Sequence, residues 1–156
     1  MGAGKSTIGR HLAKKLRWKF IDLDDEIERR EHRPIPEIFE KEGEPYFRSI
    51  ERLCLKTLPR SQKVVVALGG GAFIDPENRD HAEKTGLTVW LKASFSQLAS
   101  RVKIDGRRPK FVDKDQAEQL YQTREPFYAL AKIHIATDEG TPDSAADEII
   151  EVLRKL

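Results

Sequence analysis

The first residues of the chain restrict its fold more than any other segment does. Residues 2–7 read GAGKST, which matches the second half of the phosphate-loop pattern: a glycine, four free positions and then Gly-Lys-Ser/Thr. Glycines allow the backbone N–H groups of such a loop to turn toward phosphate oxygens, and the helix that follows presents its positive end to the same anion. Ile8, Leu12 and Leu16 recur at helical spacing. The segment therefore predicts a phosphate-binding loop that opens a helix over Lys5–Leu16, rather than an ordinary helix start.

The phosphate-loop pattern is incomplete on its N-terminal side. Its first glycine belongs two residues before Met1, and the strand that anchors the loop belongs before that glycine. We therefore expect that Met1 is an internal methionine of a longer chain, which is cut here within the loop. A chain that truly began at Met1 would have a compromised phosphate site and a compromised sheet centre.

Short apolar runs alternate with longer amphipathic segments along the rest of the chain. Strands are predicted at Trp18–Leu23, Val64–Leu68, Leu87–Leu91 and Ile133–Ala136. Helices are predicted within 25–60 with breaks near Pro34–Pro36 and Gly43–Pro45, then from Asp75-Pro76, from Ser94 to about Val102, over about Asp115–Tyr128, and from Thr141-Pro142 with Ala145, Ile149, Val152 and Leu156 on the inner face. Strands separated by helices indicate right-handed crossovers and a parallel sheet. Because Val64–Leu68 is apolar without alternation, we expect both of its faces to be covered.

The composition narrows the class of protein. The chain has 156 residues, the size of one domain spanning 1–156, and its 28 basic and 26 acidic side chains leave a formal charge of +2. That balance disfavours a general nucleic-acid or membrane-surface binder. No apolar run approaches the roughly 18–20 residues of a membrane-spanning helix, and the single cysteine, Cys54, cannot form an internal disulfide. We expect a monomeric, cytoplasmic protein that binds neither nucleic acid nor membranes.

Further motifs follow in a fixed order over nearly the whole chain. They are Asp22-Leu23-Asp24 with Glu28, Ile38-Phe39, Gly43-Glu44, Phe47-Arg48 with Glu51, Gly69-Gly70-Gly71, Arg108-Pro109 and Arg124-Glu125-Pro126-Phe127-Tyr128. Together with the N-terminal loop they resemble the shikimate kinases, a family of small P-loop kinases. The resemblance implies an α/β fold in three layers, α/β/α, with a parallel sheet of five strands in the family, the first of which is absent from this chain. It also implies substrate-binding helices at about 25–60 and a mobile lid loop at about 104–114.

The same resemblance implies an activity and a site. The activity is ATP + shikimate → ADP + 3-phosphoshikimate, in chorismate and aromatic amino-acid biosynthesis, with Mg²⁺ as the cofactor. The implied catalytic residues are Asp24, Lys5 and Arg108, and the implied metal site is Ser6 with Asp22. The implied ATP-binding residues are Gly2, Ala3, Gly4, Lys5, Ser6, Thr7, Arg101, Arg108 and Pro142. The implied substrate-binding residues are Asp24, Phe39, Phe47, Arg48, Gly69, Gly70, Gly71 and Arg124.

Elementary chemistry fits these assignments and also leaves simpler interpretations open. Shikimate carries one carboxylate and three hydroxyls, so its pocket needs cations at one end and acceptors at the other, and a guanidinium binds a carboxylate through two parallel hydrogen bonds. Asp24 is expected at the end of a strand, on the same face as Asp22 and with Asp25 turned to solvent, but it can equally be a helix cap. Arg48 and Arg124 can be solvated helix residues, and the triple glycine can be a plain turn.

Two other functions remain open at this level. One is another small-molecule P-loop kinase, acting on gluconate or a nucleoside monophosphate. The other is a non-catalytic, shikimate-kinase-like ligand-binding domain of a DNA-binding regulator. Within the lid the family usually follows Arg-Pro with two apolar residues, whereas this chain has Lys110-Phe111 after Arg108-Pro109.

Overall fold

The computed structural model describes residues 3–59, 63–101 and 114–156, with the side chains of Arg101 and Lys114 left out. Within these residues helices and strands alternate, as the sequence predicts. The helices are α1 (Lys5–Leu16), α2 (Leu23–Glu31), α3 (Ile35–Thr57), α4 (Pro76–Thr85), α5 (Phe95–Arg101), α6 (Lys114–Tyr128) and α7 (Pro142–Arg154). The strands are β1 (Lys19–Asp22), β2 (Val64–Ala67), β3 (Val89–Lys92) and β4 (Ile133–Ala136). The lid predicted at about 104–114 falls almost entirely outside the described residues.

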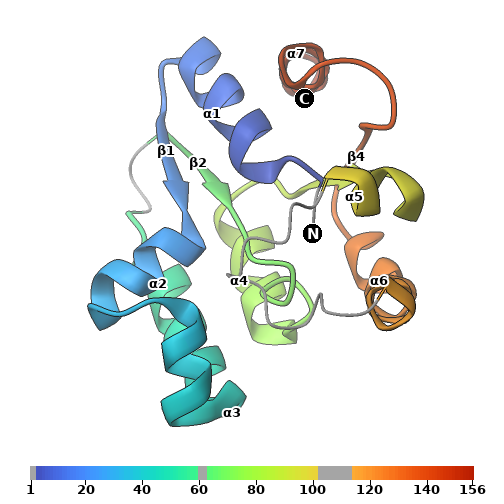
Figure 1. Ribbon diagram of the computed structural model, residues 1–156. Coiled ribbons are helices and arrows are strands. Elements are labelled where there is room, and N and C mark those ends of the chain that lie inside the picture. The colour runs from blue at the N-terminus through green and yellow to red at the C-terminus, as the bar shows by residue number, and fades with distance from the viewer. Residues whose placement is uncertain (1–2, 60–62, 102–113) are drawn as a thin grey trace.

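The strands form two parallel pairs. β1 pairs with β2 in a register that sets Lys19 opposite Val64, and β3 pairs with β4 in a register that sets Val89 opposite Ile133. Figure 1 shows β1 and β2 side by side, with β4 on the far side of the molecule. Among the described residues no strand joins the two pairs into one sheet. The parallel direction is thus confirmed, but the continuous sheet is interrupted between β2 and β3.

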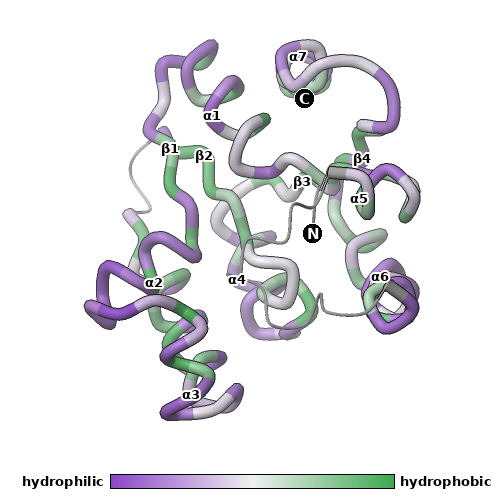
Figure 2. The backbone as a smooth tube through the Cα atoms, in the orientation of Figure 1, coloured by the Kyte–Doolittle hydropathy of each residue, from purple (hydrophilic) through white to green (hydrophobic). Residues whose placement is uncertain are grey.

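Helices cover both faces of the strands, which gives the predicted three layers. On one face α1 and α7 contribute Ile8, Leu12, Ala145 and Ile149 to a core cluster that includes Val65, Val89, Leu91, Ile133 and Ile135. Trp90 alternates with Val89 and Leu91 and therefore points to the opposite face. There its ring lies 6.3 Å, centroid to centroid, from that of Tyr128 at the end of α6. In Figure 2 the strands are mainly coloured as hydrophobic, and the outer sides of α1 and α6 as hydrophilic.

A slot separates β2 from β3. It is a cavity of about 620 Å³ lined by the consecutive residues 63–70 and 85–91, and its other lining residues include apolar side chains of α1, α3, α6 and α7. Side chains alternate between the two faces of a strand, so an unbroken run of lining residues means that the backbone edges of β2 and β3 face the cavity. Val64, Val65 and Val66 are only partly buried for this reason, although helices cover the faces of the strand as predicted.

Several boundaries differ from the sequence prediction for identifiable reasons. β1 ends at Asp22, because the carboxylate of Asp22 accepts a hydrogen bond from the Asp24 N–H and caps α2. The predicted break near Gly43–Pro45 is confirmed as a kink inside α3, where Gly43 has φ 80° and ψ 174°. The prediction that Leu156 lies on the inner face of the last helix is wrong. That helix ends at Arg154, and Leu156 is 82% exposed.

Across residues 3–59, 63–101 and 114–156, every helix is too short or too polar to traverse a lipid bilayer.

Candidate active site

The phosphate-loop segment opens α1 in the predicted way. Gly4 is the residue before the helix and has φ 79° and ψ 21°, a left-handed conformation that favours glycine. Its carbonyl accepts the first helical hydrogen bond, from the Ile8 N–H at 2.8 Å. Ala3 and Lys5 line one end of the slot, and Thr7 is exposed. Gly2 lies outside the described residues.

Ser6 and Asp22 lie together although they are 16 positions apart. The Ser6 hydroxyl donates a hydrogen bond of 2.5 Å to the Asp22 carboxylate, which joins the first turn of α1 to the end of β1. No group of three or more His, Cys, Asp or Glu side chains that could hold a metal alone occurs in the part of the chain that the structure describes. One hydroxyl with one carboxylate nevertheless fits Mg²⁺ carried in on a nucleotide, because this ion keeps several waters and takes its other ligands from substrate phosphates.

Asp24 lies in the first turn of α2 and not on the strand, so it does not share a strand face with Asp22 as predicted. Its side chain instead approaches the glycine turn. A Cβ atom built on Gly69 would lie 2.9 Å from Asp24 Oδ1 and 3.3 Å from Glu51 Oε2. The missing side chain of Gly69 thus makes room for two carboxylates. Asp25, the next residue, is exposed as predicted.

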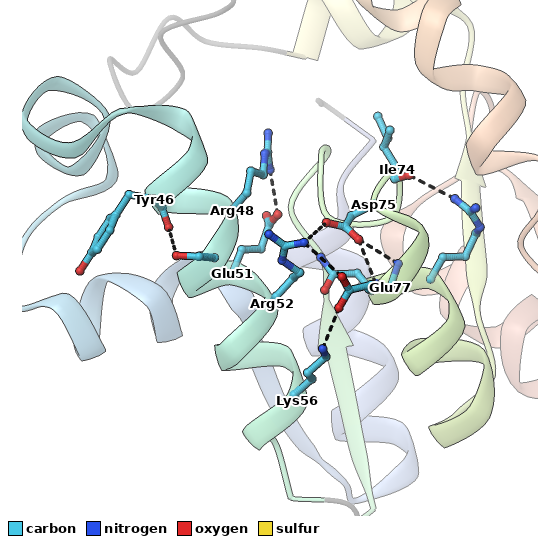
Figure 3. Close-up of polar contacts among 11 residues, drawn as sticks. Tyr46, Arg48, Glu51, Arg52, Lys56, Ile74, Asp75 and Glu77 are labelled. Atoms are coloured by element: carbon cyan, nitrogen blue, oxygen red, sulfur yellow. Dashed lines mark hydrogen bonds and ion pairs between the residues drawn. The ribbon is translucent and has the colours of Figure 1, made fainter.

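Arg48 belongs to a charged cluster on α3. Its guanidinium donates to Glu51 at 2.8 Å and to Glu44 at 3.2 Å, and it lies 5.2 Å from the centre of the Phe47 ring. Figure 3 shows the Arg48 and Glu51 side chains directed toward each other from neighbouring turns of this helix. Helical spacing of three and four residues explains both carboxylate contacts. Arg48 is therefore half-buried and ion-paired, and not the freely solvated helix residue that the sequence also allowed.

Glu51 is 1% exposed. Burial raises the pKa of its carboxyl above the ordinary value; Arg48 opposes this shift, and Asp24 and Asp75 add to it. Burial lowers the pKa of the Arg48 guanidinium, but Glu51 and Glu44 outweigh that effect and leave it raised. A guanidinium stays charged at any physiological pH whatever its neighbours, so the raised pKa of Glu51 is the shift that can change the charge of the pair.

Phe39 and Phe47 form an aromatic pair next to this cluster. Their ring centres are 4.6 Å apart with an angle of 35° between the planes, and Phe47 is buried. Both residues also belong to or pack against the core cluster of α2 and α3. The geometry is therefore compatible with both interpretations that the sequence allows, an apolar pocket wall and plain core.

The glycine turn after β2 is held from two sides. The turn itself is closed by hydrogen bonds from the Ala72 N–H to Gly69 O and from the Ile74 N–H to Gly71 O, at 3.0 and 3.3 Å. On one side, a Cβ atom on Gly71 would lie 2.5 Å from Nη1 of Arg48. On the other side, the Tyr128 hydroxyl donates to Gly70 O at 2.5 Å.

A brace between α3 and α4 fixes the position of this turn. Arg52 on α3 pairs with Asp75 and Glu77 at 3.5 and 3.4 Å, and Lys56 pairs with Glu77 at 2.9 Å (Figure 3). Asp75 also caps α4 by accepting from the Glu77 N–H at 2.8 Å. Because α4 follows the glycine turn, the brace keeps that turn against the helix that carries Arg48 and Glu51.

Arg124 completes the group from α6. It is only 9% exposed, and it lines the slot together with Lys5, Gly69 and Gly70. It also interacts with the Tyr128 hydroxyl, whose pKa is raised by burial and lowered to a smaller extent by Arg124. A guanidinium buried to this degree is rare unless it has a partner. The interpretation of Arg124 as a solvated helix residue is therefore wrong.

The structure thus brings most of the predicted substrate-binding residues into one continuous series of contacts. It runs from Asp24 through Gly69, Glu51, Arg48, Gly71 and Gly70 to Tyr128 and Arg124, with Lys5 at the edge of the adjoining slot. Pro142 is the exposed first residue of α7. The Arg101 side chain and Arg108 lie outside the described residues.

Sequence reasoning missed the part that Tyr128 plays in this site. Glu44 and Glu51 could be found from their helical spacing to Arg48. Tyr128 appeared only as the last letter of a motif, and its contact with Gly70 spans 58 positions. No local sequence pattern predicts a contact between residues so far apart in the chain.

The fold and the site together define the class of P-loop kinases: parallel strands covered on both faces, a Gly-Lys-Ser helix start, the buried carboxylate of Glu51, the buried guanidinium of Arg124 and the half-buried guanidinium of Arg48. Comparison of the chain with known proteins gives the same class. The family model described as Shikimate kinase matches residues 1–154. The shikimate kinase of Pseudomonas syringae pv. syringae is 46% identical over 160 residues, covering 100% of this chain and 93% of that protein. The shikimate kinase of a Sulfurihydrogenibium species is 38% identical over 156 residues, covering 99% and 94%.

A solved structure gives the same result in three dimensions. The shikimate kinase from Acinetobacter baumannii in complex with shikimate superimposes with a TM-score of 0.94 at 36% identity, covering 99% of this chain and 89% of that one. The chain belongs to the shikimate kinase family.

Proposed function

We propose that this protein is a shikimate kinase, which transfers the γ-phosphoryl group of ATP to a hydroxyl of shikimate and releases ADP and 3-phosphoshikimate. The observation that carries the proposal is the glycine turn, which has a carboxylate beside Gly69 and a guanidinium against Gly71. The turn presents backbone groups to a bound ligand. The protein supplies a hydrogen-bond acceptor, Asp24, at one end of the turn and a cation, Arg48, at the other. That polarity matches a molecule with hydroxyls on one side and a carboxylate on the other.

In this proposal Arg48 and Arg124 bind the carboxylate of shikimate. The Arg124 side chain is buried and that of Arg48 is half-buried, and their two helices both contact the glycine turn. Planar guanidinium groups can each supply two parallel hydrogen bonds to a carboxylate, and burial strengthens those bonds. Glu51 and Glu44 hold Arg48 in place before the substrate arrives. Phe39 and Phe47 pack against the ring of the substrate.

Asp24 receives the attacking hydroxyl. As a bond forms between the hydroxyl oxygen and the γ-phosphorus, the bond from that phosphorus to the ADP oxygen breaks, and the proton of the hydroxyl passes to the Asp24 carboxylate. The first turn of α2 and the bare backbone of Gly69 set the position of this carboxylate. Positioning contributes more than basicity, because phosphoryl transfer depends chiefly on orientation and charge stabilisation.

The start of α1 binds the phosphates of ATP. Ala3, Gly4, Ser6 and Thr7 place backbone N–H groups at the N-terminus of this helix, and Lys5 reaches the β- and γ-phosphates. Ser6 and Asp22 would hold Mg²⁺, which neutralises charge on the phosphates when bound. Gly2, Arg101, Arg108 and Pro142 remain predicted ATP contacts, with Arg108 closing over the phosphates from the lid. Action as a cytoplasmic monomer likewise stays a prediction.

Release of ADP measured with several acceptors tests the proposal. We expect release that depends on shikimate and is at least 100-fold slower with gluconate or nucleoside monophosphates offered at equal concentration, where a factor of 100 corresponds to about 2.7 kcal/mol. Omitting Mg²⁺ should abolish it. Faster ADP release with gluconate or a nucleotide would identify that compound as the substrate in place of shikimate. Tight shikimate binding without any ADP release would favour the ligand-binding domain of a regulator.

We further propose that one more parallel strand fills the slot and runs into Ala3, bringing the first glycine of the phosphate loop with it. Three features of the slot support this. Its two long walls are strand edges, its remaining lining is mainly apolar, and Ala3 and Lys5 stand at one end of it. A β-strand between two parallel neighbours satisfies backbone groups on both edges at once. Mass spectrometry of the protein made from its native gene tests the proposal, since a mass equal to the present 156 residues would contradict it.

A further inference from the structure

We propose that Tyr128 is a positioning residue, which orients the peptide between Gly70 and Gly71 for binding of the acceptor substrate. The inference rests on the proposed function, because it concerns the acceptor side of the same site. It adds a residue whose hydroxyl acts on the backbone of the site and not on the substrate itself.

The first observation is the direction of one hydrogen bond. The Tyr128 hydroxyl donates to Gly70 O at 2.5 Å, and no cis peptide bond occurs among the described residues. In a planar trans peptide the C=O of one residue and the N–H of the next point in opposite directions. Holding Gly70 O toward Tyr128 therefore holds the Gly71 N–H away from it, on the free side of the turn.

The second observation is that this peptide has few other restraints. Gly69, Gly70 and Gly71 carry no side chains, so peptide rotation within the turn meets little steric resistance. The Arg48 guanidinium fills the position of a Gly71 Cβ atom, and the two hydrogen bonds that close the turn engage the neighbouring peptides, at Gly69 O and Gly71 O. A single strong donor at Gly70 O is thus able to decide which way the Gly71 N–H points.

The third observation is that Tyr128 connects this turn to Arg124. The two residues are four positions apart on α6, hence on the same side of the helix, and their side chains interact. The ring of Tyr128 packs on Trp90 of β3, which fixes the hydroxyl relative to the strands. One residue therefore sets both the glycine peptide and the guanidinium that we assign to the substrate carboxylate.

The hydroxyl is suited to donate at all physiological pH values. Burial raises the pKa of Tyr128, and the smaller opposing effect of Arg124 does not reverse this. The phenol therefore keeps its proton. Phenylalanine at this position would preserve the ring and its packing but would lose the donor.

The same helix supplies a matched control. Tyr121 donates its hydroxyl to a backbone carbonyl, Ala93 O, at 2.9 Å, and its ring lies 6.1 Å from that of Phe95. Tyr121→Phe therefore removes a bond of the same kind from the same helix, but one whose acceptor, Ala93 O, is not part of the glycine turn. Loss of one such hydrogen bond should lower the urea midpoint of unfolding to a similar extent in either variant.

The experiment compares steady-state kinetics of the parent protein, Tyr128→Phe and Tyr121→Phe, with urea unfolding of all three. We expect Tyr128→Phe to raise the KM for shikimate about tenfold, equivalent to about 1.4 kcal/mol, with the KM for ATP changed less than twofold. Tyr121→Phe should lose comparable stability and leave the KM for shikimate unchanged. In a ¹⁵N–¹H spectrum without ligands, Tyr128→Phe should shift the Gly71 amide signal, which Tyr121→Phe should not do.

Two outcomes would overturn the inference. One is a Tyr128→Phe enzyme whose KM for shikimate equals that of the Tyr121→Phe enzyme. The other is an unchanged Gly71 amide signal in Tyr128→Phe. A parent protein that releases ADP only with an acceptor other than shikimate would reject the proposed function. The amide measurement would then still decide whether Tyr128 orients the peptide.

Discussion

The guanidinium of Arg48 occupies the space that a side chain at position 71 would need. A Cβ atom on Gly71 would lie 2.5 Å from Arg48 Nη1, much closer than real Cβ atoms approach a neighbouring group. The contact joins a turn at the end of β2 to a helix 23 positions earlier in the sequence. It makes glycine at position 71 a requirement of the site and not merely of the turn.

Gly71→Ala should therefore damage acceptor binding. The added methyl group displaces the Arg48 guanidinium, and displacement of a binding group by about 1 Å can lower kcat/KM about 100-fold. We expect a loss of this order in kcat/KM for shikimate, measured by ADP release at saturating ATP. Gly86→Ala is the matched control, because a Cβ atom there meets its nearest neighbour, Ala82 O, at an ordinary 3.8 Å. A Gly71→Ala enzyme as active as Gly86→Ala would show that Arg48 does not need its present position.

Asp24→Asn should lower turnover while shikimate still binds. The amide keeps the shape of the side chain beside Gly69 but cannot take the proton, and loss of a general base typically lowers kcat by about 10²–10⁴-fold. Turnover gives kcat, and calorimetric titration gives the shikimate dissociation constant. Asp25→Asn, at the exposed neighbouring position, should behave like the parent. Near-normal turnover in Asp24→Asn would remove this carboxylate from the chemistry.

Arg124→Ala should weaken shikimate binding far more than ATP binding. Its guanidinium is 9% exposed, and truncating one partner of a buried charge pair weakens binding by about 2–5 kcal/mol. The dissociation constants of both ligands, measured separately, test this. Arg29→Ala serves as the comparison, since its side chain is 73% exposed. Equal losses for shikimate and ATP would instead indicate that Arg124 supports the fold.

Glu51→Gln should change how stability depends on pH. Because burial raises the pKa of Glu51 in the folded protein, its contribution to stability is complete below the unfolded value of about 4.5 and is lost as pH rises through the raised pKa. Glutamine does not ionise. The unfolding free energy of Glu51→Gln minus that of the parent should therefore become more positive over this pH range and then level off.

Urea unfolding at a series of pH values measures this difference. Glu37→Gln provides a comparison of opposite sign, because the hydrogen bond from Lys41 lowers the pKa of Glu37. The parent keeps that contribution above the ordinary carboxyl pKa and loses it as pH falls through the lowered one. A difference for Glu51→Gln that stays flat, or slopes in the same direction as that for Glu37→Gln, would contradict a raised pKa at Glu51.

The sequence by itself determined the elements and the chemistry at the start of α1. Helical spacing fixed α1 at Lys5–Leu16, and Thr141-Pro142 correctly marked the start of α7. These features are local, because capping and amphipathic periodicity act within a few residues. For the same reason sequence indicated that Glu51 could hold Arg48, three positions away on one helix.

Only the tertiary structure decided which charged residues are buried and which of them meet. On sequence alone Arg124 and Arg48 could be solvated helix residues, and Asp24 was expected at the end of a strand. The contacts that assemble the site span 23 to 58 positions, from Arg48 with Gly71 to Tyr128 with Gly70. Such contacts depend on how helices pack over the strands, and packing is set by the whole chain. The sequence predicted that one strand of the sheet is missing, but only the tertiary structure placed the gap between β2 and β3, because the pairing of strands depends on how distant segments pack.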